Sequence, residues 1–402
     1  MTKTVELLSP AGDAERLKMA VAYGADAVYL AGKEFGMRAG AANFSDDDLE
    51  HAVQYCHEHG VKAYITCNIL PHDSDLVRLP AFLGLLSDIG ADAVIIADLG
   101  VLASVKKHAP RLKFHISTQF GAVNSETANY LYSLGADTIV LARELNLSEI
   151  RQIRRNTPDD LGLECFVHGA MCVSFSGRCL LSNYLTGRDS NRGNCAQPCR
   201  WKYRLLEESR PGEYFPVVED DGTYIFNSKD LCMIEHIPEL LDAGVTSLKI
   251  EGRMKSFYYT AVTAQAYRKA IDAAVSGVPL DPLWVKEVDM VSHRPYTTGF
   301  YFDEPEQYYA DSSYTTAANV VAVVESCSSE GDAVLSQRNK FFRGDELEIV
   351  IPGGVPVSFR ADKLFDENGS SIESTPRAMM IIKTALPCAV PPMSIIRKRT
   401  VQ

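Results

Sequence analysis

The chain has 402 residues, of which 46% are hydrophobic and 23% are charged, and its formal net charge is −12. This composition excludes global disorder and allows one large core together with a second, smaller domain. The acidic balance excludes a protein coated with basic residues for general nucleic-acid binding, but it leaves room for a local basic site.

Two further protein classes are disfavoured at the outset. The sequence has no apolar run of about 18 residues, so we expect no membrane span. The chain starts at Met1 without a basic segment followed by an apolar one, so we expect no secretory signal. We therefore expect a cytoplasmic protein without a membrane partner, whose ten cysteines are mostly reduced thiols.

A short phrase recurs along the first two thirds of the chain. Gly-Ala-Asp followed by an apolar pair stands at residues 24–28, 90–94 and 135–139, and a weaker copy stands at 244–248. Each copy follows a helical pattern, and glycine suits the end of a helix, where the backbone takes a positive φ. The β-branched run after it is typical of a buried parallel strand. The phrase therefore marks a repeated unit of helix and strand.

Four more strand-like runs lie between these copies, at residues 5–9, 62–67, 113–117 and 163–168. Eight parallel strands that alternate with helices most simply close into a TIM-like (β/α)8 barrel. An open, doubly wound sheet is the alternative. No Gly-x-Gly-x-x-Gly follows the first strand, which disfavours the dinucleotide-binding version of that sheet.

The domain limits follow from this pattern. We expect a β/α barrel over residues 1–275, with a cysteine-rich insertion of about 169–244 between the seventh and eighth strands. A connecting region, 276–312, contains several prolines. The last part, 313–402, alternates short strands with turns such as 352–354, which predicts a small all-β, barrel-like domain. Long insertions of this kind tend to be functional.

In a barrel, functional groups lie at the carboxyl ends of the strands. Polar residues stand at all eight of these ends: Ser9, Lys33, Asn68, Asp98, Gln119, Arg143, His168 and Glu251. We take His168 and Glu251 as the candidate catalytic residues. The alternative for His168 is a structural role at the end of its strand.

Six of the ten cysteines fall between Cys165 and Cys232. Five of them form the candidate metal site: Cys172, Cys179, Cys195, Cys199 and Cys232. No Cys-x-x-Cys pair is present, which disfavours structural zinc and thioredoxin-type redox chemistry. An iron–sulfur cluster takes four thiolates from separate loops. The alternative is that these thiols are small buried hydrophobic residues. Five thiols exceed four ligands, and spacing does not identify the spare one.

The last of these cysteines, Cys232, is expected in the first turn of a helix over residues 230–241, with Ser228 as its N-cap.

The insertion around the cysteines is basic. It holds six cationic residues, Arg178, Arg188, Arg192, Arg200, Lys202 and Arg204, against Glu164 and Asp189, so residues 164–204 carry +4. Such a stretch favours an anionic substrate or an RNA strand, although a solvated surface paired with acidic residues explains it as well.

Aromatic residues of the insertion, Tyr184, Trp201 and Tyr203, are candidates for stacking on bases or for the core. A second charged patch, which includes Lys249, Glu251 and Arg253, leaves the eighth strand and suggests ligand binding. Arg38, Asn43 and Phe44 after the second strand form a weaker candidate. The alternative in both places is a loop with solvated charges.

Common hydrolase motifs are missing. The segment 57–59 has its two histidines too close together for the His-Glu-x-x-His motif, and no Gly-x-Ser-x-Gly is present. The residues instead resemble those of the collagenase-like peptidases, peptidase family U32. The resemblance is carried by segments 7–12, 164–172, 176–182, 188–201, 227–232 and 248–253.

Within that family the sequence is most similar to the branch of bacterial tRNA hydroxylation proteins. The resemblance implies an enzyme that converts a tRNA wobble uridine to 5-hydroxyuridine without oxygen, with prephenate or another small dicarboxylate as the hydroxyl donor. It also implies a 4Fe-4S cluster on Cys172, Cys179, Cys195 and Cys232, leaving Cys199 as the spare, although some sister proteins have a ligand at that spacing. Substrate-binding residues would be Arg38, Arg178, Arg188, Arg192, Arg200, Lys249 and Arg253.

Two other functions remain open on the sequence alone. One is a collagenase-like peptidase, and the other is a non-catalytic RNA-binding iron–sulfur scaffold. A second protein subunit is a possible partner in each case.

Overall fold

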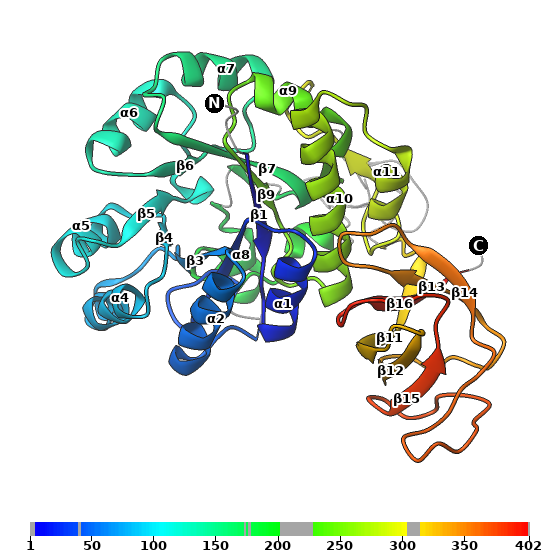
Figure 1. Ribbon diagram of the computed structural model, residues 1–402. Coiled ribbons are helices and arrows are strands. Elements are labelled where there is room, and N and C mark those ends of the chain that lie inside the picture. Colours follow the sequence, from blue (N-terminus) through cyan, green and yellow to red (C-terminus); the bar gives the residue numbers. More distant parts are fainter. Residues whose placement is uncertain are drawn as a thin grey trace, which may run out of the picture.

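The computed structural model describes residues 5–38, 42–172, 174–175, 178–201, 228–303 and 314–400. A β/α barrel and a smaller β domain make up this part of the chain. In Figure 1 the barrel runs in colour from blue to green, and the β domain, in orange and red, lies beside the last barrel helix.

The barrel strands follow the expected order. They are β1 (Glu6–Pro10), β2 (Ala27–Ala31), β3 (Lys62–Cys67), β4 (Ala93–Ile96), β5 (Lys113–Ile116), β6 (Thr138–Val140), β7 (Gly162–Ala170) and β9 (Ser247–Ile250). Each pairs in parallel with the next, and β9 pairs with both β7 and β1. These two pairings close the cylinder, so the barrel prediction is confirmed and the open-sheet alternative is wrong.

The repeated phrase has a structural reason. Its four glycines, Gly24, Gly90, Gly135 and Gly244, all have positive φ, between 77° and 99°. The aspartates that follow two of them bind the neighbouring strand: Asp26 accepts a hydrogen bond from the Leu7 amide, and Asp92 from the Ala63 amide, each at 2.8 Å. The phrase therefore ends a helix and also fixes the start of the adjacent strand.

Helices cover the outside of the barrel (Figure 1). They are α1 (Ala14–Ala22), α2 (Asp46–Glu58), α3 (Asp73–Leu76), α4 (Leu79–Asp88), α5 (Leu99–His108), α6 (Ser125–Ser133), α7 (Leu147–Arg155), α9 (Ile237–Asp242) and α10 (Phe257–Ser276). Residues 258–267 of α10 are all buried, because this helix packs against the barrel on one side and against the β domain on the other. None of the helices in the described ranges is both long and apolar enough to cross a bilayer.

The segment that contains Cys232 differs from the prediction. Residues Asp230–Cys232 form a strand, β8, and not the first turn of a helix; α9 begins only at Ile237. The reason is that β7 extends beyond the barrel, and β8 pairs antiparallel with its last residues, from His168 to Ala170. On its other edge β8 pairs with β10 (Tyr296–Thr297), so 276–312 contributes a strand and a helix, α11 (Pro282–Val288), to the barrel body.

The C-terminal domain is an antiparallel half-barrel. This confirms the prediction of a small all-β, barrel-like domain. Its strands are β11 (Ala318–Cys327), β12 (Asp332–Gln337), β13 (Glu346–Val350), β14 (Val357–Arg360), β15 (Ile381–Ala385) and β16 (Ile395–Arg399), in the order β14-β13-β16-β11-β12-β15. It has its own apolar core, but Val323, Val350 and Ile395 belong to the barrel core. The two domains therefore share buried surface.

Candidate functional site

Charged side chains converge at the carboxyl ends of the barrel strands. Glu251, just after β9, lies 3.8 Å from the Arg38 guanidinium and 3.4 Å from that of Arg143. Arg143 is held in place because its Nη1 donates to the Ala170 carbonyl at 2.8 Å and its guanidinium stacks on the Phe166 ring at 3.8 Å. We call Arg38, Arg143, Glu251 and Arg253 the mouth cluster.

Arg253 is the most deeply buried member of the mouth cluster, with 3% of its surface exposed. Its Nη1 donates to the Thr66 hydroxyl at 3.0 Å. Its Nε and Nη2, and the Nε of Arg143, have no hydrogen-bond partner among the described residues. Burial lowers the pKa of Arg253 to about 10, so its guanidinium is still charged at neutral pH. Buried donors without an acceptor are costly, which points to an acceptor supplied by a ligand.

Glu251 acts as the counter-ion of this cluster. Burial raises the pKa of its carboxyl group, but Arg38, Arg143 and Arg253 together lower it below its ordinary value. The side chain is therefore a carboxylate at neutral pH and does not hold a proton to donate. Three guanidinium groups against one carboxylate leave two positive charges in excess.

Lys249 has a different role from the one predicted. Its ammonium group binds Glu164 at 2.7 Å in the barrel interior, where both side chains are almost completely buried. Ser247 donates to the same carboxylate at 3.1 Å. This neutral pair forms the floor below the mouth cluster, so Lys249 supports the site from beneath.

The loop after β2 carries unusual backbone geometry. Phe35, Arg38 and Asn43 all have positive φ although none is glycine, with φ of 72° at Arg38. Such conformations are costly and concentrate at functional sites. Here the strained loop delivers the Arg38 side chain to Glu251.

His168 does not join the mouth cluster. The β7–β9 pairing shifts its register between Phe166 and His168. The His168 ring packs against Tyr259 and Tyr267 of α10 and against Tyr296 of β10. Burial lowers the pKa of His168 to about 3, so the ring is neutral. Its Nε2 has no partner among the described residues. This placement matches the structural role more closely than the catalytic one.

The cysteine-rich insertion lies against the barrel mouth. Arg192 binds Asp75 on α3 through two hydrogen bonds of 2.7 and 3.0 Å. Arg178 donates to the carbonyls of Gln119 and Phe120 after β5, each at 3.0 Å. At Gly193 a Cβ atom would lie 2.9 Å from the Arg38 amide. The insertion is therefore fastened to the loops after β2, β3 and β5.

One thiol of the insertion, Cys199, is affected by the charges of three others. Burial raises the pKa of Cys199, Arg200 lowers it, and the nearby Cys172, Cys195 and Cys179 raise it further. We call these four residues the thiol group. Backbone amides point at two of its sulfurs: Leu181 donates to Cys179 Sγ at 3.4 Å, and Gln197 to Cys195 Sγ at 3.3 Å.

The thiol group also borders the mouth cluster. Glu251 raises the pKa of Arg38 against the lowering effect of burial, and Cys172 and Cys195 are among the groups that raise it further. The thiols and the guanidinium groups therefore share one end of the barrel.

Cys232 has other neighbours. Burial raises the pKa of its thiol to about 11, and the groups that act on it are the Ile234 amide, Tyr267, Asp289 and Glu235. The Tyr267 hydroxyl donates to its sulfur at 3.8 Å. The charges of Cys172, Cys179 and Cys195 thus act on Cys199, while Cys232 lies with His168 and contacts Tyr267 of α10. The fourth ligand stays a prediction, with Cys232 and Cys199 as the candidates.

Within the described ranges, no three His, Cys, Asp or Glu side chains are placed to share a single metal ion. A four-iron cluster makes a different demand, because each thiolate binds a different iron, and the sulfurs lie farther apart than around one ion. Four thiols, amides directed at sulfur and nearby guanidinium groups fit such a cluster in donor type and charge.

The comparisons with known proteins give the family. The model of peptidase family U32 matches residues 12–311, and that of the family's C-terminal domain matches residues 316–397. The chain belongs to peptidase family U32. One relative, a tRNA hydroxylation protein of Bacillus subtilis, is 36% identical over 99% of this chain and 96% of its own length.

Two other relatives of this U32 protein are named for different functions. A 23S rRNA 5-hydroxycytidine synthase of Escherichia coli is 35% identical over 89% of this chain and 54% of its own length. A collagenase of Porphyromonas gingivalis is 32% identical over 74% of each chain. The family therefore includes proteins named for RNA hydroxylation and proteins named for proteolysis.

The predicted cationic residues of the U32 protein lie in several different places. Arg178 and Arg192 fasten the insertion, and Arg200 also does so, because it donates to the carbonyls of Ser228 and Met171 at 2.8 and 2.9 Å. Arg188 is exposed and donates to Asn194 at 3.1 Å. Lys202 and Arg204, like Tyr203, lie outside the described residues. Only Arg38 and Arg253 join the mouth cluster.

Arg143 is the member that the sequence reasoning left out of the binding set. Its position at a strand end was visible in the sequence, but its approach to Glu251 depends on closure of the barrel.

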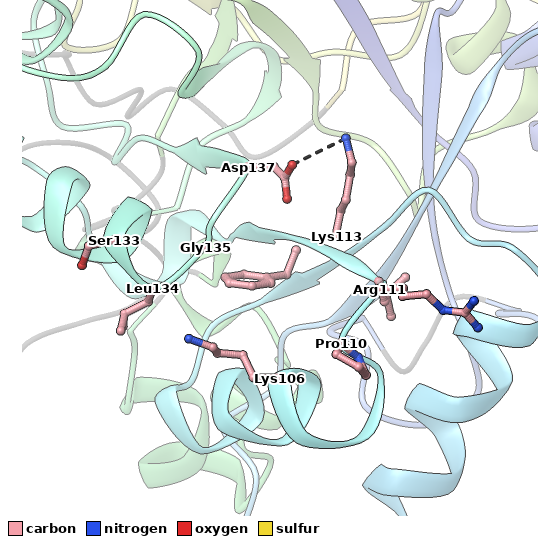
Figure 2. Close-up of a pocket in the computed structure, with 10 residues that line it drawn as sticks. Lys106, Pro110, Arg111, Lys113, Ser133, Leu134, Gly135 and Asp137 are labelled. Atoms are coloured by element: carbon pink, nitrogen blue, oxygen red, sulfur yellow. Dashed lines mark ion pairs between the residues drawn. The ribbon is translucent and has the colours of Figure 1, made fainter.

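A basic pocket elsewhere is separate from this site. It lies at the amino end of β5, between α5 and α6, and Figure 2 shows Lys106, Arg111 and the Lys113–Asp137 pair around it.

Proposed function

We propose that this protein is an iron–sulfur-dependent RNA-modifying enzyme that hydroxylates a tRNA wobble uridine to 5-hydroxyuridine without oxygen, using prephenate as the hydroxyl donor. The observation that carries the proposal is the thiol group set beside the cationic mouth cluster, at the end of the barrel where such folds place their chemistry. A cytoplasmic location goes with this function.

The RNA substrate is supported by the relatives. A tRNA hydroxylation protein is similar to this chain over nearly the whole length of both, and an rRNA 5-hydroxycytidine synthase is similar over most of this chain. Both names describe hydroxylation of RNA, and the second places the hydroxyl group at position 5 of a pyrimidine. We infer the same type of reaction here.

The cofactor is supported by the chemistry of the donors. Cys172, Cys179 and Cys195, with Cys232 or Cys199 as the fourth ligand, would hold a 4Fe-4S cluster, which supplies electron transfer when bound. Amide donors to sulfur, as at Cys179 and Cys195, stabilise the charge on thiolate ligands. Arg200 and Arg38 offset the negative charge of the ligand set.

Prephenate is supported by the charge of the mouth cluster. This small dicarboxylate carries two negative charges, which balance the two positive charges in excess there. Guanidinium groups bind carboxylates with paired, charge-assisted hydrogen bonds. The nitrogens of Arg253 and Arg143 that lack partners among the described residues are donors of the required kind.

The peptidase alternative has less support from the site. The relative named collagenase shares the family, but the histidine at the strand ends, His168, is enclosed by tyrosines near α10 and does not stand beside a nucleophile at the mouth. The scaffold alternative predicts the same cofactor without a reaction, so it is distinguished by activity.

The test uses cells and purified protein. Mass spectrometry of tRNA nucleosides from a deletion strain should show loss of 5-hydroxyuridine and its derivatives, and the wild-type gene should restore them. The Cys179→Ala gene should fail to restore them, whereas Cys388→Ala, at an exposed cysteine of the β domain, should succeed. Unchanged nucleosides in the deletion strain would rule out the tRNA reaction, and full restoration by Cys179→Ala would exclude a catalytic cluster.

Protein purified without oxygen gives the matching chemical readout. The wild type and Cys388→Ala should contain equal amounts of iron and sulfide, and Cys179→Ala should contain little of either. Iron-free wild-type protein that cleaves gelatin would favour the peptidase alternative.

A further inference from the structure

The short helix α8 (Leu181–Thr186) presents large apolar side chains to water. Tyr184 is 87% exposed, Leu180 just before the helix is 72% exposed, and Leu185 is 42% exposed. The Tyr184 amide donates to the Leu180 carbonyl at 2.9 Å, so the two residues stand one helical turn apart and lie on the same face. We call Leu180 and Tyr184 the α8 ridge.

The ridge stabilises little of the fold itself, because both side chains point into solvent. Exposed single apolar residues are common, but an aromatic ring with 87% exposure next to a second apolar side chain at helical spacing forms a small flat surface. A surface of this kind matters for binding only if it is held rigidly.

The inner side of α8 provides that rigidity. Ser182, fully buried, donates to the Arg188 carbonyl at 2.7 Å and accepts from the Ala196 amide at 2.9 Å. Ser190 donates to the Cys179 carbonyl, and Asn191 donates to it at 3.3 Å. The Asn191 carbonyl in turn accepts from the Leu70 amide after β3 at 3.1 Å. The ridge is therefore fixed relative to the barrel mouth.

The ridge also adjoins the thiol group directly. Leu180 follows Cys179, and the first amide of α8, that of Leu181, donates to the Cys179 sulfur at 3.4 Å. The ridge and the Cys179 sulfur are therefore neighbours at the surface of the insertion.

The local charge favours a polyanion as the occupant. The described residues from 174 to 201 contain four arginines, Arg178, Arg188, Arg192 and Arg200, against one aspartate, Asp189. Asp75 neutralises Arg192, so this surface keeps an excess charge of +2 in a chain whose net charge is −12. Arg188 is exposed and lies two residues after the end of α8. Apolar side chains beside exposed arginine are the combination that binds unpaired nucleotides, in which aromatic rings stack on bases and cations contact phosphates.

We propose that the α8 ridge is a stacking platform for an unpaired base of the substrate RNA, next to the base that is modified. Tyr184 stacks on that base, Leu180 packs against its edge, and Arg188 contacts the phosphate backbone. The proposal rests on the proposed function, because it assumes that a single-stranded loop of RNA approaches the thiol group.

The test measures binding of RNA without any reaction. The full-length protein, purified without oxygen, is titrated against a fluorescently labelled, unmodified anticodon stem-loop RNA, and the anisotropy is recorded. Replacing Tyr184 with Ala should raise Kd by at least about fivefold, since stacking on one base contributes about 1–3 kcal/mol. Tyr184→Phe, which keeps the ring, should bind nearly as well as the wild type.

Matched variants separate stacking from other effects. Tyr130→Ala removes a ring that is 62% exposed on α6, outside the insertion, and should leave Kd unchanged. Arg188→Ala should weaken binding and reduce its salt dependence, whereas Tyr184→Ala should weaken it equally at low and high salt, because a ring releases no counterions. Iron content should match the wild type in every variant.

The outcomes are distinct. Wild-type protein that binds no RNA would overturn both this proposal and the proposed function. Wild-type binding that Tyr184→Ala leaves unchanged would overturn the stacking platform alone. A Tyr184→Ala variant with normal RNA affinity but an altered oligomeric state would show that the ridge contacts protein, which also overturns the proposal.

Discussion

Arg397 of the C-terminal domain binds Glu287 of α11 through two hydrogen bonds of 2.7 Å, and both side chains are almost completely buried. The same guanidinium donates to Glu348 at 2.8 Å and to the Tyr258 hydroxyl on α10 at 3.0 Å. Burial alone would lower the pKa of Arg397, but these partners raise it above its ordinary value. One buried cation therefore joins the β domain to the barrel.

The first prediction concerns this link. Arg397→Ala leaves Glu287 buried without its partner and leaves Glu348 with Arg399 alone. Breaking a buried ion pair in this way costs about 3–5 kcal/mol. We expect the free energy of unfolding in urea to fall by that order. Arg360→Ala, which removes an exposed ion pair with Asp362, should change it by less than about 1 kcal/mol. Equal stability of the two variants would show that Arg397 does not join the domains.

The second prediction concerns pH and His115 on β5. Burial first, and then Lys249, Lys62 and Lys113, lower the pKa of this imidazole from 6.5 to about 3. Between these two pH values the unfolded chain binds a proton that the folded chain does not, so stability falls as the pH falls. At about pH 5 the loss relative to about pH 7.5 amounts to about 2 kcal/mol from this group.

The measurement is urea unfolding at both pH values. In His115→Phe, which keeps an aromatic ring against Tyr64, the loss of stability on acidification should be smaller by about 2 kcal/mol. His51→Phe on α2 is the control, because the His51 side chain is exposed to water, and it should respond to acid as the wild type does. A His115→Phe protein with an unchanged acid response would mean that the imidazole is protonated in the fold.

The barrel was predictable because its signals are local. Each Gly-Ala-Asp phrase contains the turn that ends a helix and the start of the strand that follows, so the order of the strands follows from sequence alone. In two copies the aspartate also binds the neighbouring strand. Glu251 and Arg253 were also found in this way, since any residue just after a barrel strand lies at the mouth.

Other features depend on contacts between distant segments. Asp230–Cys232 became a strand only because β7 extends past the barrel and offers it a partner. That pairing, and the register shift near His168, turn both Cys232 and His168 towards α10. Arg143 approaches Glu251, and Cys199 approaches three other thiols, across more than one loop. Spacing along the chain contains none of this information.

The third prediction decides the fourth thiolate ligand. Cys199→Ala should lose most of its iron and sulfide when purified without oxygen, because the charges of Cys172, Cys179 and Cys195 act on this thiol. Cys232→Ala should keep its iron, because that thiol contacts Tyr267 of α10 and the other thiols are not among the groups that act on it. Iron per chain and the visible absorbance measure the result. The reverse pattern would assign the ligand to Cys232 and require the insertion to rearrange around the cluster.

The last prediction tests the mouth cluster as the prephenate site. Arg253→Met keeps the length of the side chain but removes two buried nitrogens that have no partner among the described residues. A hydrogen bond to a charged group contributes about 1.5–3 kcal/mol, so Kd for prephenate, measured by calorimetry, should rise about tenfold to a hundredfold. Arg343→Met, on the surface of the β domain, should leave Kd unchanged.

The same variant gives a second readout. Without ligand, Arg253→Met should be at least as stable as the wild type, because it relieves the repulsion between buried guanidinium groups and removes donors without acceptors. Prephenate should raise the melting temperature of the wild type and have little effect on the variant. A variant that is destabilised without ligand yet binds prephenate normally would show that Arg253 supports the fold through Thr66, and the dicarboxylate would then have to bind elsewhere.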